Sequence, residues 1–303
     1  MSDFLRIVEV GPRDGLQNEA IPIPTEAKLE FIRSLRAAGL QDIEVTSFVS
    51  PKWVPQLGDA AELWPQLPAD GGHYSALVPN ARGLDRALEV GVERIAVFTA
   101  ASEAFVQKNL NMSIEESLAG FRAMVETFRQ QRPGGWVRGY VSTIVECPYA
   151  GRIAPEQVQN VVDALLAMGV DEVSLGETIG VAVPAEIERV AEAIAHVPKD
   201  KVAWHFHDTR GTAIANVAAC VAQGYRIFDA SAAGLGGCPY APGAGGNLAT
   251  DDLVYFAERS GLSTGVDAKA LAKASEPILK LLGRPMTARA QRAVCSIADT
   301  ARN

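Results

Sequence analysis

The chain has 303 residues, of which 48% are hydrophobic and 21% are charged, and its formal net charge is -8. This composition is typical of a globular protein with a sizeable core and excludes the disordered and fibrous classes. The negative charge, without a cluster of Lys and Arg, argues against a nucleic-acid or anionic-membrane surface, so we expect a small-molecule partner.

The N-terminal segment shows no targeting pattern. MSDFLRIVEVGPRDG has neither the basic start and apolar run of a secretion signal nor the Arg- and Ser-rich character of a transit peptide. The longest uncharged run, Ala230 to Thr250, is interrupted by glycine and proline, which excludes a membrane helix. Four widely spaced cysteines fit a reducing compartment, so we expect a cytoplasmic protein.

Short β-branched runs alternate with longer amphipathic segments, as in βα units that build a parallel sheet. The predicted strands are residues 5–11, 42–48, 73–79, 94–100, 137–144, 172–178, 202–208 and 227–234. The predicted helices between them include Thr25 to Ala38, Ser113 to Gln131, Pro155 to Met168, Pro184 to His196 and Thr212 to Gln223. Ser113 with the following IEES resembles a capping box at a helix start.

Eight βα repeats favour a closed TIM (β/α)8 barrel, and no glycine-rich phosphate loop follows a predicted strand. Two further helices are predicted, Ala268 to Leu282 and Thr287 to Arg302, as additions on one side of the barrel. We therefore expect one catalytic domain over residues 1–303, with the barrel at about 4–260 and the helical addition at about 265–303.

Functional residues of such a barrel collect at the carboxyl ends of its strands. Arg13 and Asp14 directly follow the first predicted strand. In the second strand Glu44 lies between Ile43 and Val45, so the two-residue period of a strand sends it into the barrel if those neighbours pack on helices. An interior carboxylate needs a partner.

The seventh predicted strand, VAWHFHD, carries two of the four histidines. His205 and His207 share one face, and Trp204 and Phe206 share the other, where they can pack on the helical ring. A pair of hydrogen-bonded core histidines is the alternative. Two histidines at this spacing on a barrel strand, with acidic residues across the interior, favour a metal site.

The type of metal follows from the other ligands. His205 and His207 alone suit Zn²⁺, whereas Asp14 and Asn247, which stands at the start of the predicted helix GNLATDDLVY, would complete a mixed nitrogen and oxygen shell. Such a shell suits Mg²⁺ or Mn²⁺ with positions open for substrate.

Several longer motifs occur between Arg6 and Asp252. They are VEVGPRDGLQNE, IEVTSFVSPKWVPQLGD, AASEAF, SIEES, RGYVS, CPYAG, HDTRGTAIAN and GLGGCPYAPGAGGNLATDDLVY. Together they resemble the 3-hydroxy-3-methylglutaryl-coenzyme A lyases. RDGLQNE and GLGGCPYA are long and specific.

The resemblance implies a divalent-cation-dependent enzyme that cleaves a branched 3-hydroxyacyl-CoA into acetyl-CoA and acetoacetate within a TIM barrel, as in leucine breakdown. It leaves the oligomeric state open, including a homodimer or a higher homo-oligomer. The matching positions are the metal ligands Asp14, His205, His207 and Asn247, the catalytic Arg13, Cys238 and His205, and Glu44 close to the metal site. We also expect a catalytic role for Glu177 and substrate contacts from Gln17 and Arg210, although Arg210 fits a solvated loop arginine equally well.

Two positions depart from the family pattern. LGETIG has Glu177 where the family usually has aspartate, and HDTRG has Arg210 where it often has tyrosine. A longer carboxylate would suit a shorter substrate such as citramalyl-CoA, which yields pyruvate, so this alternative stays open. The acetyl-CoA-dependent synthases of the same barrel class are a weaker alternative because they extend well beyond the barrel and lack the GLGGCPYA loop.

The tetrapeptide CPYA occurs twice, at Cys147 and at Cys238. Cys238 is surrounded by glycines that would let its loop close over substrate. Cys147 lacks these glycines, so we expect it to be a packed residue. We predict that Cys238 controls turnover and that Cys147 does not.

Overall fold

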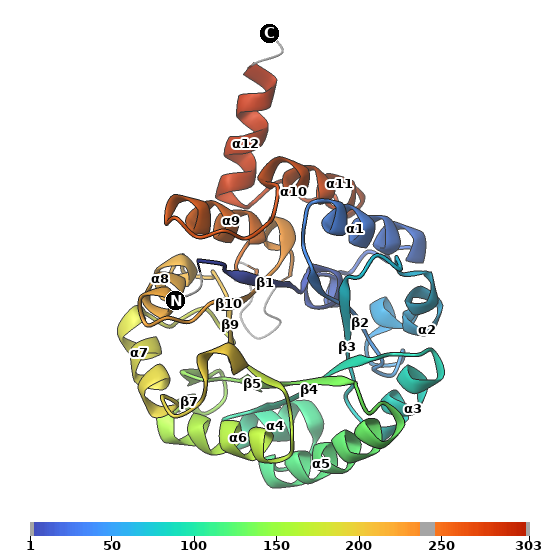
Figure 1. The fold of residues 1–303 in the computed structure, drawn as a ribbon, viewed down its shortest axis with the longest axis vertical. Coiled ribbons are helices and arrows are strands. Elements are labelled where there is room, and N and C mark those ends of the chain that lie inside the picture. The colour runs from blue at the N-terminus through green and yellow to red at the C-terminus, as the bar shows by residue number, and fades with distance from the viewer. Residues whose placement is uncertain (1–2, 237–245, 301–303) are drawn as a thin grey trace.

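The computed structural model describes residues 3–236 and 246–300, so Cys238 lies outside the described residues. Eight parallel strands form a closed barrel in the order β1, β10, β9, β8, β5, β4, β3 and β2. Helices surround this ring of strands on all sides (Figure 1). The fold is the TIM barrel that the eight βα repeats predicted.

The barrel strands correspond to the eight predicted ones. They are β1 (Arg6–Glu9), β2 (Asp42–Ser47), β3 (His73–Leu77), β4 (Arg94–Ala100), β5 (Trp136–Ser142), β8 (Glu172–Glu177), β9 (Val202–Phe206) and β10 (Ile227–Ala230). A short antiparallel hairpin, β6 (Glu146–Cys147) with β7 (Gly151–Arg152), lies between β5 and the next helix. This hairpin was not predicted.

The helices likewise follow the predicted pattern. They are α1 (Thr25–Ala37), α2 (Ala60–Leu63), α3 (Ala81–Glu89), α4 (Glu103–Leu110), α5 (Ile114–Gln131), α6 (Pro155–Ala167), α7 (Pro184–Ala193), α8 (Ala213–Ala222), α9 (Thr250–Arg259), α10 (Ala268–Ala274), α11 (Glu276–Leu282) and α12 (Arg289–Thr300). The capping box of α5 is present: the Ser113 hydroxyl accepts from the Glu116 amide at 3.0 Å, and Glu116 Oε2 accepts from the Ser113 amide at 2.8 Å.

The single helix predicted over 268–282 is wrong. The segment forms two helices that meet at Ser275, with Pro277 in the first turn of α11. Proline has no N–H to donate and its ring clashes with the preceding turn, so a helix restarts there more readily than it continues. In Figure 1 α10 and α11 pack beside α1 and α9, whereas α12 projects away from the barrel.

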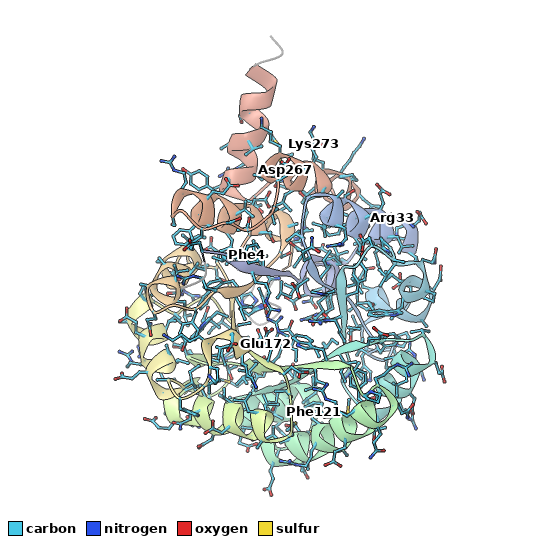
Figure 2. The ribbon with its side chains drawn as sticks, in the orientation of Figure 1. Phe4, Arg33, Phe121, Glu172, Asp267 and Lys273 are labelled. Atoms are coloured by element: carbon cyan, nitrogen blue, oxygen red, sulfur yellow. The ribbon has the colours of Figure 1, made fainter. Side chains whose placement is uncertain are left out.

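The two faces of the strands bury different side chains. Trp204 and Phe206 of β9 are stacked with ring centroids 5.9 Å apart in the apolar layer between barrel and helices. The interior of the barrel holds charged residues, among them Glu44 and Arg138, which are 0% and 1% exposed. Figure 2 shows Glu172 on the inner side of the ring of strands. A polar interior of this kind requires paired charges.

Among the helices of residues 3–236 and 246–300, none has both the length and the apolar character that crossing a membrane requires.

Candidate metal centre

The chain leaves β1 through a one-turn π-helix, η1 (Gly11–Gly15). The amides of Asp14 and Gly15 both donate to the Val10 carbonyl, at 2.8 and 3.1 Å, which fixes the turn at the carboxyl end of the barrel. Arg13 donates from Nε to the buried carboxylate of Glu44 and from Nη1 to Asp14 Oδ1 at 2.5 Å. Glu44 thus points into the barrel, and Arg13 is its ionic partner.

Arg13 carries a permanent charge. Burial works to lower its pKa, but the neighbouring carboxylates Glu44 and Asp14 raise it above the ordinary value. In turn, burial would raise the pKa of Asp14, yet Arg13 and the two nearby histidines lower it to about 2. Asp14 is therefore ionised at pH 7, the form in which a carboxylate can bind a cation.

His205 has one ring nitrogen bound to a carboxylate. Its Nδ1 lies 3.2 Å from Asp229 Oδ2, and Asp229 also accepts from Arg138 Nη2 at 2.6 Å and from the Ser174 hydroxyl at 2.8 Å. Because the pKa of Asp229 is lowered, chiefly by Arg138 against the opposing effect of burial, the carboxylate is an acceptor and Nδ1 carries a proton. Nε2 of His205 is thereby left to bind a cation.

His207, one residue beyond β9, is oriented by the backbone. Its Nδ1 lies 2.7 Å from the carbonyl oxygen of Glu177, which can only accept, so Nδ1 again carries the proton. Burial first, and then the neighbouring His205, lower the pKa of His207 to about 4. The ring is therefore neutral at pH 7, the form in which imidazole binds metals.

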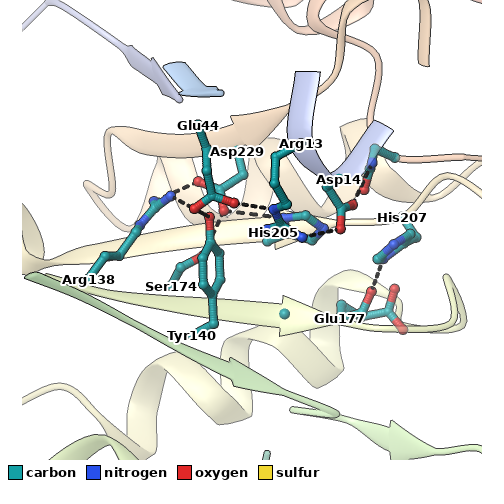
Figure 3. A network of polar contacts seen from close by, with 12 residues as sticks. Arg13, Asp14, Glu44, Arg138, Tyr140, Ser174, Glu177, His205, His207 and Asp229 are labelled. Carbon is teal, nitrogen blue, oxygen red and sulfur yellow. Dashed lines mark hydrogen bonds and ion pairs between the residues drawn. The ribbon is translucent and has the colours of Figure 1, made fainter. Parts of the chain in front are cut away.

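Three of the predicted ligands form one cluster. Asp14, His205 and His207 each offer a ligand atom, and these atoms all lie within 4.8 Å of one another. Figure 3 shows the three side chains converging from η1 and from the end of β9. Separations of this size allow one cation to contact all three residues.

Asn247 lies beside this cluster, although not where the sequence placed it. The helix predicted to start there begins at Thr250, and Asn247 instead pairs with His207 in an antiparallel bridge. The prediction was wrong because the backbone of residues 246–248 is held against the end of β9, through a bond from the Leu248 amide to the Phe206 carbonyl at 2.9 Å.

The amide of Asn247 tests whether the site suits a cation. Its nitrogen donates to Asp14 Oδ2 at 2.9 Å and to the Leu235 carbonyl at 3.1 Å. Its oxygen, Oδ1, is buried and accepts no hydrogen bond from the described part of the chain. A buried oxygen without a donor beside two imidazoles and a carboxylate fits a divalent cation of the Mg²⁺ or Mn²⁺ type.

Glu177 ends β8 and is 1% exposed. Its Oε1 accepts from the Val181 amide at 3.0 Å, while Oε2 is buried without a hydrogen-bond partner among the described residues. Burial raises the pKa of Glu177, against the opposing effect of the amides of residues 179–182. The carboxylate is thus directed into the loop after β8 and does not belong to the three-residue cluster.

The two predicted substrate contacts lie at the mouth of the barrel. Arg210 is exposed and donates from Nη1 to the carbonyls of Ile179 and Gly180, at 3.0 and 3.1 Å, in the loop that follows Glu177. Gln17 is half-buried just after η1. Cys147 is 1% exposed and packs in an apolar cluster with Phe105 and Val106.

Sequence reasoning missed the polar residues behind the ligands. The Tyr140 hydroxyl donates to Glu44 Oε2 at 3.1 Å and lies 3.1 Å from Arg138 Nη1. With Asp229 and Ser174 they form the network of Figure 3. Arg138 and Asp229 alternate with apolar neighbours on their strands, as Glu44 does, and this alternation could have identified them.

The fold and the cluster together define a class: a TIM barrel with a candidate metal centre of nitrogen and oxygen donors at the carboxyl ends of its strands. The family model described as HMGL-like matches residues 5–278, so the chain belongs to the HMGL-like family, that of the hydroxymethylglutaryl-CoA lyases.

Individual relatives agree over nearly the whole chain. A 3-hydroxy-3-isohexenylglutaryl-CoA/hydroxymethylglutaryl-CoA lyase of Pseudomonas aeruginosa is 49% identical, over 96% of this chain and 97% of that protein. The hydroxymethylglutaryl-CoA lyase of Pseudomonas mevalonii is 47% identical over 96% of this chain and 97% of its own length.

Solved structures give the same result. Hydroxymethylglutaryl-CoA lyase from Pseudomonas aeruginosa has a TM-score of 0.94 and 48% identity, over 98% of this chain and 99% of that chain. An HMG-CoA lyase from Acinetobacter baumannii in complex with coenzyme A and 3-methylmalate has a TM-score of 0.91 and 36% identity, over 97% of this chain and 96% of that chain.

Proposed function

We propose that the protein is a divalent-cation-dependent carbon–carbon lyase that cleaves 3-hydroxy-3-methylglutaryl-CoA into acetyl-CoA and acetoacetate. The observation that carries this proposal is the convergence of Asp14, His205 and His207 with the buried oxygen of Asn247, which accepts no hydrogen bond from the described residues. The names of the relatives supply the substrate class.

Breaking the bond between C2 and C3 places three demands on the site. A base must take the proton of the tertiary 3-hydroxyl, the acetyl-CoA fragment must leave as a stabilised thioester enolate, and that enolate must then be protonated. A Mg²⁺ or Mn²⁺ ion held by Asp14, His205, His207 and Asn247 would acidify the hydroxyl and orient the substrate.

Arg13 is placed to stabilise the enolate. Its guanidinium has five N–H groups, and its bonds to Glu44 and Asp14 use two of them. These two contacts fix the plane of the group before substrate arrives, and its pKa is raised, so it stays charged. Remaining donors of a fixed guanidinium at the mouth of the barrel can bind the thioester oxygen as charge develops there.

Glu177 is our candidate for the base. Its carboxylate has one oxygen held by the loop amide of Val181 and one without a donor among the described residues, and burial raises its pKa. A carboxylate with a raised pKa is a better proton acceptor. Its own carbonyl orients His207, so the base and a metal ligand share one short segment. Cys238 remains our candidate for the acid that protonates the enolate carbon.

The experiment that tests this function is a cleavage assay with purified protein and Mg²⁺ or Mn²⁺. The substrates are 3-hydroxy-3-methylglutaryl-CoA, the isohexenyl homologue that the Pseudomonas aeruginosa relative is named for, and citramalyl-CoA. We expect acetyl-CoA release from the first. No release from any of the three would sink the lyase proposal, and release from citramalyl-CoA alone would revise its substrate.

We further propose that residues 1–303 form a single catalytic domain and that the protein acts in the cytoplasm. Leu271, Ile278 and Leu282 of the C-terminal helices belong to the same apolar core as the barrel, which supports one domain. Limited proteolysis that releases a stable barrel without these helices would contradict it.

A further inference from the structure

Glu9, the last residue of β1, is a second buried carboxylate at the catalytic end of the barrel. It is 0% exposed and makes no ion pair within the described part of the chain. Its oxygens instead accept three hydrogen bonds: Oε1 from the amides of Gly11 and Ala232, at 2.8 and 2.9 Å, and Oε2 from the Thr250 hydroxyl at 2.6 Å. Burying a carboxylate without a cation is costly, so packing alone does not account for it.

The three donors belong to three separate segments. Gly11 opens η1, the turn that carries Arg13 and Asp14. Ala232 lies where the chain leaves β10, and Thr250 is the first residue of α9, three residues after Asn247. One carboxylate therefore joins the turn that supplies the ligand Asp14 to both segments that flank residues 237–245.

These segments are packed too closely for side chains at two glycines. A Cβ at Gly11 would lie 2.5 Å from Glu9 Oε1, and a Cβ at Gly15 would lie 2.8 Å from the Ser231 hydroxyl oxygen. Such distances are shorter than carbon–oxygen contact permits. A Cβ at Gly11 would also lie 3.2 Å from the Ser231 hydroxyl oxygen, so glycine at both positions lets the turn pack closely against residues 231–235.

The segment after β10 is fixed by further hydrogen bonds besides the one from Ala232 to Glu9. Ala233 has φ 58°, a left-handed conformation that is unfavourable for alanine. Its amide donates to Asp251 Oδ2 at 2.8 Å, and its carbonyl accepts from the Thr287 hydroxyl at 3.1 Å. Backbone strain of this kind persists only where surrounding contacts determine it, as they do beside a functional site.

We propose that Glu9 is a positioning residue that sets the placement of Asp14 relative to Asn247. The two ligands lie on different segments and touch through the bond from Asn247 Nδ2 to Asp14 Oδ2 at 2.9 Å. Glu9 binds the backbone of the first segment and the start of the helix that follows the second. This inference rests on the proposed metal-dependent function, because it assigns Glu9 to the geometry of that same site.

The test compares Mn²⁺ binding, measured by titration calorimetry, in Glu9→Gln, Thr250→Val and Thr250→Ser. Thr99→Val is the matched control: Thr99 and Thr250 are 1% and 0% exposed, and Thr99 also makes a buried hydroxyl bond, to Ser117 of α5 on the outer side of the barrel. We expect Glu9→Gln and Thr250→Val to weaken Mn²⁺ binding about 10- to 100-fold, as loss of a residue that orients ligands does.

Thr250→Ser retains the hydroxyl and is expected to bind Mn²⁺ like wild type, as is Thr99→Val. Unchanged affinity in both Glu9→Gln and Thr250→Val, or an equal loss in Thr99→Val, would overturn the proposal. If Glu9→Gln does not fold, Thr250→Val and Thr250→Ser decide. A wild-type protein that binds Mn²⁺ but cleaves no acyl-CoA would contradict the proposed function while leaving the calorimetric comparison intact.

Discussion

The two histidines of the candidate metal centre are oriented by acceptors of different kinds. A carboxylate that is itself paired with Arg138 holds His205, and a backbone carbonyl holds His207. The pKa of His205 is raised, because Asp229 outweighs burial, whereas the pKa of His207 is lowered to about 4. At the scale of single residues, the same ring can thus be a more or a less basic ligand according to what its second nitrogen contacts.

Glu177 leads to a prediction about pH. Because burial raises its pKa, the base becomes available only as pH rises through that value, so kcat/KM should fall on the acidic side. We expect Glu177→Gln to lower kcat about 10²- to 10⁴-fold and to remove this acidic limb. Glu177→Asp is the control, because it keeps the carboxylate. An unchanged pH profile in Glu177→Gln would exclude Glu177 as the base.

Glu9 makes folding itself depend on pH. Burial raises its pKa from 4.5 to about 7, so the folded protein holds a proton that the unfolded chain has released. The contribution of this proton to the free energy of unfolding is fully present below about pH 4.5 and is lost as pH rises through about 7. The free energy of unfolding should fall by about 3 kcal/mol over this range.

This dependence can be measured by denaturant unfolding of the metal-free protein at pH 5 and pH 8. Wild type should lose stability relative to Glu9→Gln as the pH rises. The unfolding free energy of wild type minus that of Glu9→Gln should therefore be lower at pH 8 than at pH 5. Asp251, whose pKa burial raises to about 6, contributes in the same direction and is present in both proteins. A constant difference between the two proteins would show that Glu9 does not titrate in this range.

At the scale of elements, the two CPYA segments follow different strands in the sequence, the first after β5 and the second after β10. Cys147 lies in the β6–β7 hairpin, where its Sγ accepts from the Tyr149 amide at 3.4 Å. We predict that Cys147→Ala leaves kcat unchanged and costs about 1 kcal/mol of stability, as removal of a small buried side chain does. Cys238→Ser should lower kcat by at least about 10²-fold, if this thiol is the proton donor.

Steady-state kinetics and thermal unfolding of both variants check this pair. Wild-type turnover in Cys238→Ser would remove the cysteine from the mechanism. Loss of turnover in folded Cys147→Ala would show that the hairpin contributes to the site in a way that its packing does not reveal.

The strands were predictable because each alternates or concentrates β-branched residues over a short run, a local property of the sequence. The helix ends were less so. The helical pattern over 268–282 reads as one long helix, although Pro277 also suits the first turn of a new helix. The position of Asn247 depends on its pairing with His207, which only the folded barrel provides.

At the scale of the whole molecule, a bound cation should stabilise the fold. A ligand that binds only the folded state adds about 2.7 kcal/mol when its concentration is 100 times Kd. We therefore expect chelator to lower Tm and to abolish cleavage, and Mg²⁺ or Mn²⁺ to restore both. Calorimetric melting with and without chelator measures this effect. Full activity in chelator would contradict the roles given to His205 and His207.

The sequence predicted the barrel, and it predicted three residues that the fold brings together, Asp14, His205 and His207, because those residues end or follow strands in sequence. It did not predict the buried residues that hydrogen-bond to these side chains and orient them. Arg138 and Asp229 are 91 residues apart, and no local pattern says that they pair. Glu9 is hidden for the same reason, since two of its three donors, Ala232 and Thr250, lie more than 200 residues further along the chain.

The polar interior forms a continuous chain of contacts. Arg6 at the start of β1 contacts Glu172, Glu172 lies 2.9 Å from Arg138 Nε, and Arg138 holds the carboxylate that orients His205. Charges linked in this way cannot be exchanged one at a time without leaving a buried charge unpaired. In the evolution of this barrel, replacements of charged residues at the amino ends of the strands would therefore be accepted only as compensated pairs, and each pair would also alter how Asp229 orients His205 at the carboxyl ends.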